Sequence, residues 1–297
     1  MTASVSMAEQ IDTQQVEQLA AMANASRESG KYDSAEYFFR QALAIAERVF
    51  SADDRVIMEL LNDLGVTHKY QGRYDEAEQC YWRAMAIAPA LLGPDHPDVA
   101  SLYHNLGGLE HARGRYAFGE PLARRAVTIR EQALVADHLQ VATDKAALAA
   151  LLDGQGNYVE AEQLYQQASV VFEQTCGPEY HELAVIFNNL AAIAYARHDH
   201  AEAERLYRRA LAIKERNLGQ THPDVGMTFN NLAVLYKSQG RYAQAELLYR
   251  RALAIFTAEL RPEHPTLLAC QENLALLLRA MGHQSEAAPL AAHVGEQ

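Results

Sequence analysis

Asparagine recurs along this chain at positions separated by whole multiples of 42 residues. Asn62, Asn188 and Asn230 form one series, and Asn105, Asn189, Asn231 and Asn273 form a second series that is offset by one residue. An asparagine side chain carries both a donor and an acceptor, so it can pair with the N–H and C=O groups of an extended peptide whatever the side chains of that peptide are. The first chemistry that these residues suggest is recognition of a peptide backbone.

The recurrence of asparagine has more than one explanation. Asparagine is a mediocre helix former, so its repetition on equivalent helical faces needs a cause. That cause is ligand contact, hydrogen bonding between neighbouring repeats, or inheritance from a duplicated ancestor. In the fourth repeat, Ala146 and Ala147 replace the amides. We expect that stretch to be either an apolar pocket for a ligand side chain or a break between two contact zones.

A second series lies about two helical turns after the asparagines and is mostly basic. Its members are Arg27, Lys69, His111, Tyr195, Lys237 and Arg279. On an acidic chain these residues either hold a carboxylate of the ligand or form solvated helix ends, where cations suit the negative pole of the helix dipole. Tyr195, Lys237 and Arg279 therefore join the asparagines as candidate residues for peptide binding.

The residues that most often serve catalysis or metal binding show no such convergence. His96, His222 and His264 each precede a proline in a linker, and the three cysteines are far apart and match no metal spacing. The sequence contains no nucleophile elbow, phosphate loop or paired metal ligands. We therefore expect no catalytic residue, no metal and no cofactor, and we interpret the chain as a protein other than an enzyme.

All of these side chains are carried by a 42-residue unit that occurs seven times without insertion or deletion. Its anchors are Gly30, Gly72, Gly114, Gly156, His198, Gly240 and Gly282. A period of this kind is typical of a solenoid, which displays one long continuous surface. We expect a single solenoid over residues 14–297, with the last repeat acting as a cap, and a disordered N-terminal segment over residues 1–13.

Each unit has the pattern of a helical hairpin, and the sixth unit shows it plainly. Phe229, Leu232 and Tyr236 fall on one face of a first helix, and Gly240 separates it from a second helix with its own apolar stripe. Small residues recur where the two helices must approach closely, at Gly65, Gly107, Ala149, Ala191, Ala233 and Ala275 in the first helices. The sequence therefore predicts an all-α fold of seven helix–turn–helix repeats.

These hairpins resemble tetratricopeptide repeats, lengthened from about 34 residues to the form found in kinesin light chains. The marks of the resemblance are the HPDV linkers, the FNNLAVLY run at 229–236 and the RRALAI run at 250–255. The resemblance implies a right-handed superhelical α-solenoid whose first helices line a concave groove. It also implies that residues equivalent to the kinesin light chain asparagines contact a peptide: Asn105, Asn188, Asn189, Asn230, Asn231 and Asn273. Asn62 joins them by its position in the repeat.

Composition narrows the class of partner. The chain carries 26 basic and 38 acidic residues, a formal net charge of −12, which argues against nucleic acid and anionic membranes as partners. Its few, widely spaced cysteines fit a reducing compartment, and residues 1–13 lack the pattern of a signal peptide. We expect residence in the cytoplasm.

The sequence thus predicts a non-catalytic scaffold or adaptor that binds an extended peptide or a partner protein in its groove. The alternative is a self-associating or autoinhibited regulatory module, such as a sensor or effector. The identity of the partner, its pathway and the oligomeric state are open at this stage.

Overall fold

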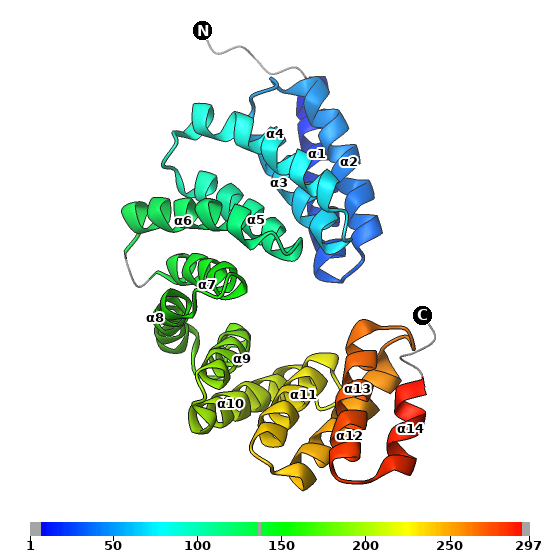
Figure 1. The fold of residues 1–297 in the computed structure, drawn as a ribbon. Helices are drawn as coiled ribbons and strands as arrows, with labels where there is room; N and C mark the ends of the chain where they lie inside the picture. The colour runs from blue at the N-terminus through cyan, green and yellow to red at the C-terminus, as the bar shows by residue number, and fades with distance from the viewer. Residues whose placement is uncertain (1–6, 136–137, 293–297) are drawn as a thin grey trace. The chain divides into compact units, whose positions relative to one another are not determined.

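A computed structural model describes residues 7–135 and 138–292, which form fourteen helices without a strand (Figure 1). The helices are α1 (Met7–Glu28), α2 (Tyr32–Val49), α3 (Arg55–Tyr70), α4 (Tyr74–Leu92), α5 (Pro97–Ala112), α6 (Tyr116–Ala133), α7 (Leu139–Gly154), α8 (Tyr158–Cys176), α9 (His181–Ala196), α10 (His200–Leu218), α11 (Pro223–Ser238), α12 (Tyr242–Glu259), α13 (Pro265–Ala280) and α14 (Gln284–Ala292). The predicted all-α repeat fold is confirmed.

The chain divides into two compact units, residues 1–164 and residues 165–297, with the boundary inside α8. Unit 1 contains the hairpins α1–α2, α3–α4 and α5–α6, and unit 2 contains α9–α10, α11–α12 and α13–α14. Within each unit, the second helix of a hairpin also packs against the first helix of the hairpin that follows it. That all seven repeats form one continuous solenoid stays a prediction.

The turn inside each hairpin explains the seven anchor residues. Gly30 has φ 70° and Gly240 has φ 73°, in the left-handed region where a side chain is normally unfavourable. His198 occupies the equivalent turn with φ 62°, although it is not a glycine. The repeat therefore keeps the same turn geometry even where its usual residue is replaced.

The small residues of the first helices allow close approach of the second helices, as predicted. A Cβ atom on Gly65 would lie 2.6 Å from Cε1 of Tyr81, and Tyr81 is completely buried. Ala191 and Ala233 are also completely buried. Larger side chains at these positions would force the two helices of a hairpin apart, because interiors are already close-packed.

The linker histidines cap helices. Nδ1 of His96, His222 and His264 accepts a hydrogen bond of 3.1 to 3.2 Å from the backbone N–H two residues later, and a proline opens each of these helices. The side chain thus satisfies one of the N–H groups left unpaired at a helix N-terminus. No group of three or more histidine, cysteine, aspartate or glutamate side chains could hold a metal ion within the residues described.

The prediction for the N-terminal segment was wrong over residues 7–13. Helix α1 begins at Met7, and Oδ2 of Asp12 lies 3.6 Å from a guanidinium nitrogen of Arg48 on α2. Once the packed part of α1 has nucleated, each further residue adds a hydrogen bond at little cost, so the helix extends beyond the repeat pattern. Residues 1–6 of the predicted disordered segment lie outside the described part of the chain.

Candidate functional site

The predicted asparagines lie on one face of the first helices, which we call the ladder face. It carries Asn62 and Asn105 in unit 1, and Asn188, Asn189, Asn230, Asn231 and Asn273 in unit 2. All seven side chains are half-buried. They are therefore neither core residues nor freely solvated ones.

Asparagines of successive first helices are hydrogen bonded to each other. In unit 1, Nδ2 of Asn105 donates to Oδ1 of Asn62 at 2.7 Å. In unit 2, Asn231 donates to Asn188 at 3.1 Å, and a longer bond of 3.4 Å joins the amides of repeats six and seven. Each bond joins residues 43 positions apart. Of the explanations that the sequence left open, hydrogen bonding between repeats is observed in the structure.

This bonding leaves the amides with unused hydrogen-bonding capacity. Each side-chain amide has two N–H donors and a carbonyl oxygen with two lone pairs, and one bond to a neighbour uses one of these. The bond also fixes the orientation of the amide, which lowers the entropy lost when a ligand binds. Structural bonding and ligand contact are thus compatible on the same residue.

Asn189 differs from the other members of the ladder. Its Nδ2 donates to the hydroxyl oxygen of Tyr165 on α8 at 2.8 Å, and Tyr165 is 1% exposed. The Asn189 amide nitrogen is therefore directed toward the neighbouring second helix. We expect Asn189 to contribute more to packing than to ligand contact.

The basic residues that follow the ladder asparagines along the first helices have different surroundings in the two units. In unit 1, a guanidinium nitrogen of Arg27 lies 3.1 Å from Oδ1 of Asp63, and burial lowers the pKa of Lys69, which has no ion-pair partner in the described structure. In unit 2, the side chains of Lys237 and Arg279 form no ion pair or hydrogen bond with any described residue. These two cations remain available to a ligand carboxylate.

Exposed apolar side chains flank the ladder face in unit 2. Val185 is 51% exposed, Met227 is 38% exposed and Leu276 is 43% exposed. Val185 and Met227 precede an asparagine by three residues, and Leu276 follows one by three, so all three share the face of the amides. This part of the ladder face therefore combines amides with apolar contact area.

The ladder face of unit 1 is ionic instead. It contains a pocket of about 240 Å³ lined by Arg55, Met58, Glu59, Asn62, Asp63, Asp98, Ser101 and Leu102. Arg55 spans this pocket through contacts of 2.7 Å to Glu59 and 3.2 Å to Asp98. The charged groups there already have partners, so a ligand would have to displace ion pairs.

Sequence reasoning missed a buried ionic cluster in unit 1. Nε of Arg130 lies 2.6 Å from Oδ2 of Asp144, and both residues are at most 5% exposed. Nδ1 of His104, on the ladder face, lies 2.7 Å from the other oxygen of Asp144. Equivalent positions in the next repeat hold Phe172 and Ile186. Two charged residues at repeat positions that are apolar in most of the other repeats were the signal that could have revealed the pair.

The family of the chain follows from comparison with known proteins. A family model for the tetratricopeptide repeat matches residues 15–90, 57–132, 98–174, 144–216, 182–258 and 224–294. These overlapping matches cover nearly all of the repeat region predicted from the 42-residue period. No curated protein matches this chain.

Two similar solved structures are of the kinesin light chain-like type. The TPR-like repeats of a protein assigned as a kinesin light chain of Podosopora anserina are 27% identical, with a TM-score of 0.56, over 67% of this chain and 94% of that one. BtubC (BKLC) from P. vanneervenii is 25% identical, with a TM-score of 0.59, over 83% of this chain and 91% of that one. Both comparisons agree with the resemblance seen in the linkers and hairpins.

A sensor protein shares the fold at lower identity. The apo form of the quorum sensor NprR from B. thuringiensis is 12% identical, with a TM-score of 0.64, over 97% of this chain and 87% of that one. At this identity the likeness shows the fold alone. The family match, the hairpin geometry and the two kinesin light chain-like structures together establish that this chain belongs to the tetratricopeptide repeat family.

Proposed function

We propose that this chain is a non-catalytic scaffold that binds an extended peptide of a partner protein along its ladder face. Tetratricopeptide repeats are scaffolds for protein interaction, and no catalytic family matches the chain. The observation that carries the proposal is the amide pairing of Asn105 with Asn62 and of Asn231 with Asn188, which recurs in both units and leaves donors and acceptors unused.

The spacing of the amides suits an extended peptide. Neighbouring helices pack about 10 Å apart, and an extended strand advances about 3.3 Å per residue. One amide pair would therefore meet the backbone about every three residues. Across the three hairpins of unit 2, this spacing predicts a ligand of about ten residues.

Unit 2 supplies what such a ligand needs besides backbone hydrogen bonds. Val185, Met227 and Leu276 offer apolar contact beside the amides. Lys237 and Arg279 lie further along the same helices without an acidic partner among the residues described. We therefore place the peptide on unit 2 and expect it to carry apolar side chains and a carboxylate.

The test is selection of peptides from a random library by the full chain, followed by titration of the best binder. Asn230→Ala and Asn231→Ala should each weaken binding about tenfold, because each removes a backbone hydrogen bond and leaves a peptide group unpaired. Asn217→Ala is the matched control, because Asn217 is exposed and its amide bonds to the Glu179 carbonyl, away from the ladder. Equal binding by all variants would contradict a ladder-face site.

The alternative is a self-associating or autoinhibited regulatory module. Light scattering over a range of protein concentrations separates it from a scaffold that binds a foreign peptide. A monomer that binds the selected peptide agrees with our proposal, whereas an oligomer that the peptide cannot dissociate favours self-association. Because the cysteines are few and widely spaced, we expect the scaffold to act in the cytoplasm.

A further inference from the structure

Three ionisable side chains of unit 1 form a row across the first helices, near the C-terminal ends of these helices. Lys69 of α3, His111 of α5 and Asp153 of α7 occupy equivalent repeat positions, 42 residues apart. Helix α5 packs against both α3 and α7, so the three side chains follow one another across neighbouring helices. We call these three residues the charged row.

Lys69, at one end of the charged row, has lost hydration without gaining an ionic partner. It is half-buried and forms no ion pair or hydrogen bond with any described residue. A Cβ atom on Gly108 would lie 3.0 Å from Nζ of Lys69, so the ammonium group rests against the backbone of α5. Burial lowers the pKa of Lys69, because the charged form is the one that needs hydration. Other half-buried cations of unit 1, such as Arg27, Arg113 and Lys145, form ion pairs of 2.6 to 3.1 Å.

Asp153, at the other end of the row, carries the opposite charge in the same condition. It is half-buried, and its carboxylate has neither an ion pair nor a hydrogen bond in the described part of the chain. Burial raises its pKa. Asp153 also lies in the last turn of α7, at the negative pole of the helix dipole, where an anion is unfavourable. The helix dipole therefore accounts for a lysine at this repeat position but not for an aspartate.

The two charges are separated by His111 on the helix between them. Partial burial and the charge of Lys69 lower the pKa of His111, so its imidazole is neutral at pH 7. The ring packs edge-on against Tyr116, with 5.4 Å between the ring centroids. A neutral imidazole has one hydrogen-bond donor and one acceptor. The centre of the row can therefore bond to a peptide group, while its two ends carry charge.

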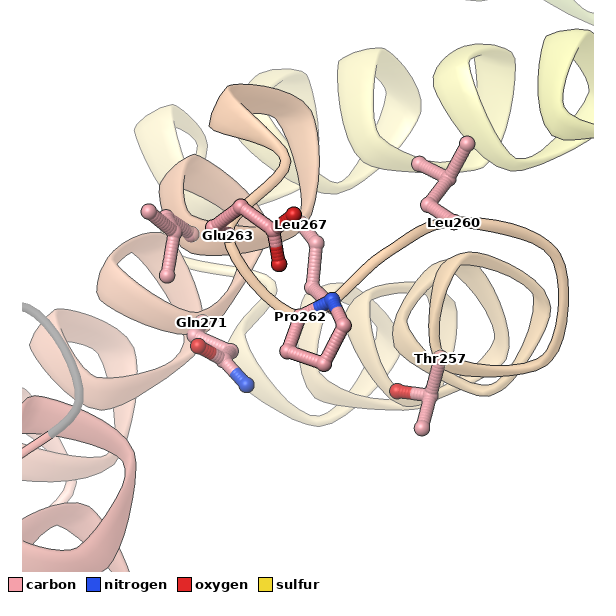
Figure 2. Close-up of a pocket in the computed structure, with 7 residues that line it drawn as sticks. Thr257, Leu260, Pro262, Glu263, Leu267 and Gln271 are labelled. Carbon is pink, nitrogen blue, oxygen red and sulfur yellow. The ribbon is translucent and has the colours of Figure 1, made fainter.

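The recess between α12 and α13 of unit 2 shows how a charge is placed when water remains its partner (Figure 2). The recess has a volume of about 330 Å³, and Glu263, the one charged residue that the described structure places in its lining, is exposed. Hydration stabilises such a carboxylate without a protein partner. Lys69 and Asp153 have lost part of this hydration, so a ligand that supplies opposite charges would stabilise both of them.

We propose that the charged row binds an extended peptide that carries an acidic and a basic residue about six residues apart. The acidic residue would pair with Lys69, the basic residue with Asp153, and the imidazole of His111 with the peptide backbone between them. Helices α3 and α7 are two helix spacings apart, about 20 Å, and an extended strand advances about 3.3 Å per residue, which sets the separation. Charge complementarity thus selects this occupant. The site belongs to unit 1 and does not depend on the peptide site of unit 2.

The test is selection of peptides from a random decapeptide library by the full chain carrying Met227→Asp, a change that should disable the ladder face of unit 2. We expect the selected peptides to share an acidic and a basic residue about six positions apart. In calorimetric titration of the best binder, Lys69→Gln and Asp153→Asn should each weaken binding at least tenfold. Lys31→Gln and Asp53→Asn are the matched controls and should leave binding unchanged, because both side chains are exposed and have no ion pair among the described residues.

Charge reversal tests the pairing itself. On the wild-type protein, replacing either charged residue of the peptide by glutamine should weaken binding at least tenfold. The Lys69→Asp protein should bind the peptide whose acidic residue is changed to lysine at least tenfold more tightly than the wild-type protein does. The comparison of peptides on the wild-type protein decides the matter even if the Lys69→Asp variant fails to fold.

The stability of the free protein provides an independent measurement. Because neither charge has a partner within the described protein, Lys69→Gln and Asp153→Asn should melt at or above the Tm of the wild type. A lower Tm in either variant would show that the protein itself supplies a partner, and this would overturn the proposal. It would equally be overturned by failure to select any peptide, by selected peptides without the charge pair, or by equal binding to the neutralised variants and the wild type.

Discussion

The ladder faces of the two units carry the same amide pairing in different chemical surroundings. In unit 1, the amides of Asn62 and Asn105 lie beside a pocket spanned by the ion pairs of Arg55. In unit 2, the equivalent amides lie beside the exposed apolar side chains of Val185 and Met227. One backbone scaffold thus presents two surfaces.

This difference shows which parts of a repeat are free to vary. Residues that join the helices of a hairpin, such as Gly65 and Ala233, are buried and tightly packed, so large replacements are excluded. The residues three positions before Asn62, Asn188 and Asn230 are exposed instead and contribute little to the hairpin. Glu59 in unit 1 and Val185 in unit 2 occupy equivalent positions of this kind. Binding specificity can therefore differ between units without loss of the fold.

The largest expected effect concerns the buried ion pair of unit 1. Asp144→Ala should lower the free energy of unfolding by about 3–5 kcal/mol, because Arg130 would then be a buried charge without its partner. The equivalent change in unit 2, Thr228→Ala, removes a hydrogen bond from Lys214 of 3.1 Å and should cost about 1 kcal/mol. Chemical denaturation measures both. Equal losses would show that the ion pair does not distinguish the units.

A compensating double variant sharpens the same comparison. Arg130→Phe with Asp144→Ile copies the apolar pair Phe172 and Ile186 of the next repeat. It should recover most of the stability lost in Asp144→Ala, since well-packed apolar residues commonly replace a buried ion pair without penalty. A double variant as unstable as the single one would mean that the His104 contact or the local packing requires the charges.

The next prediction tests which of the two ladder faces, that of unit 1 or that of unit 2, binds the peptide. Met227→Asp should weaken binding of the library-selected peptide at least tenfold, because it places a charge in the apolar flank of the unit 2 ladder. Ser101→Asp, at the equivalent position of unit 1, should change affinity less than threefold. Isothermal titration calorimetry gives both values. Binding that is weakened by Ser101→Asp but not by Met227→Asp would place the peptide on unit 1.

Acidification should affect both units through the same repeat position. Burial raises the pKa of Glu36, but hydrogen bonds from Gln71 and Arg73 outweigh it and lower the pKa to about 2. The equivalent Glu204 also has a lowered pKa, because bonds from Arg241 and Tyr236 outweigh its burial. A depressed carboxyl pKa gives stability that is complete above the unfolded value of 4.5 and is lost as pH falls toward 2.

Glu36→Gln tests this pH dependence. The variant should be less stable than the wild type by about 1–3 kcal/mol at neutral pH, and the difference should shrink between pH 4.5 and pH 2. Thermal melts across that range measure it, with Glu59→Gln as the exposed carboxyl control. If the difference in stability between the variant and the wild type stays constant down to pH 2, Glu36 does not contribute to the loss of stability in acid.

The smallest expected effect is the salt dependence of peptide binding. Lys237 and Arg279 are partly or fully exposed, so their attraction to a ligand carboxylate is screened at physiological ionic strength. Lys237→Gln should weaken binding about twofold to fivefold at low salt and less at high salt. Binding that is insensitive to salt in both proteins would leave these cations as solvated helix ends.

Much of the fold could be predicted because its determinants are local and repeated. The glycine turns, the proline-started helices and the apolar stripe of Phe229, Leu232 and Tyr236 are each defined within one unit of sequence, and seven copies reinforce the pattern. The start of α1 was predicted incorrectly, because a helix can extend beyond its packed part without an apolar pattern.

The candidate site could be predicted only in outline. Helical periodicity placed the asparagines on one face, but it could not show that Asn231 pairs with Asn188 or that Asn189 bonds to Tyr165.

The sequence by itself determined the repeat period, the pairing of helices into hairpins and the face on which the asparagines lie, since these follow from spacing along one helix. The tertiary structure decided the amide partners, the enclosure of Arg130 with Asp144 and the different surroundings of the two ladder faces. These features depend on how residues from different helices align when the helices pack. A change of one residue in that alignment would give every amide a different partner.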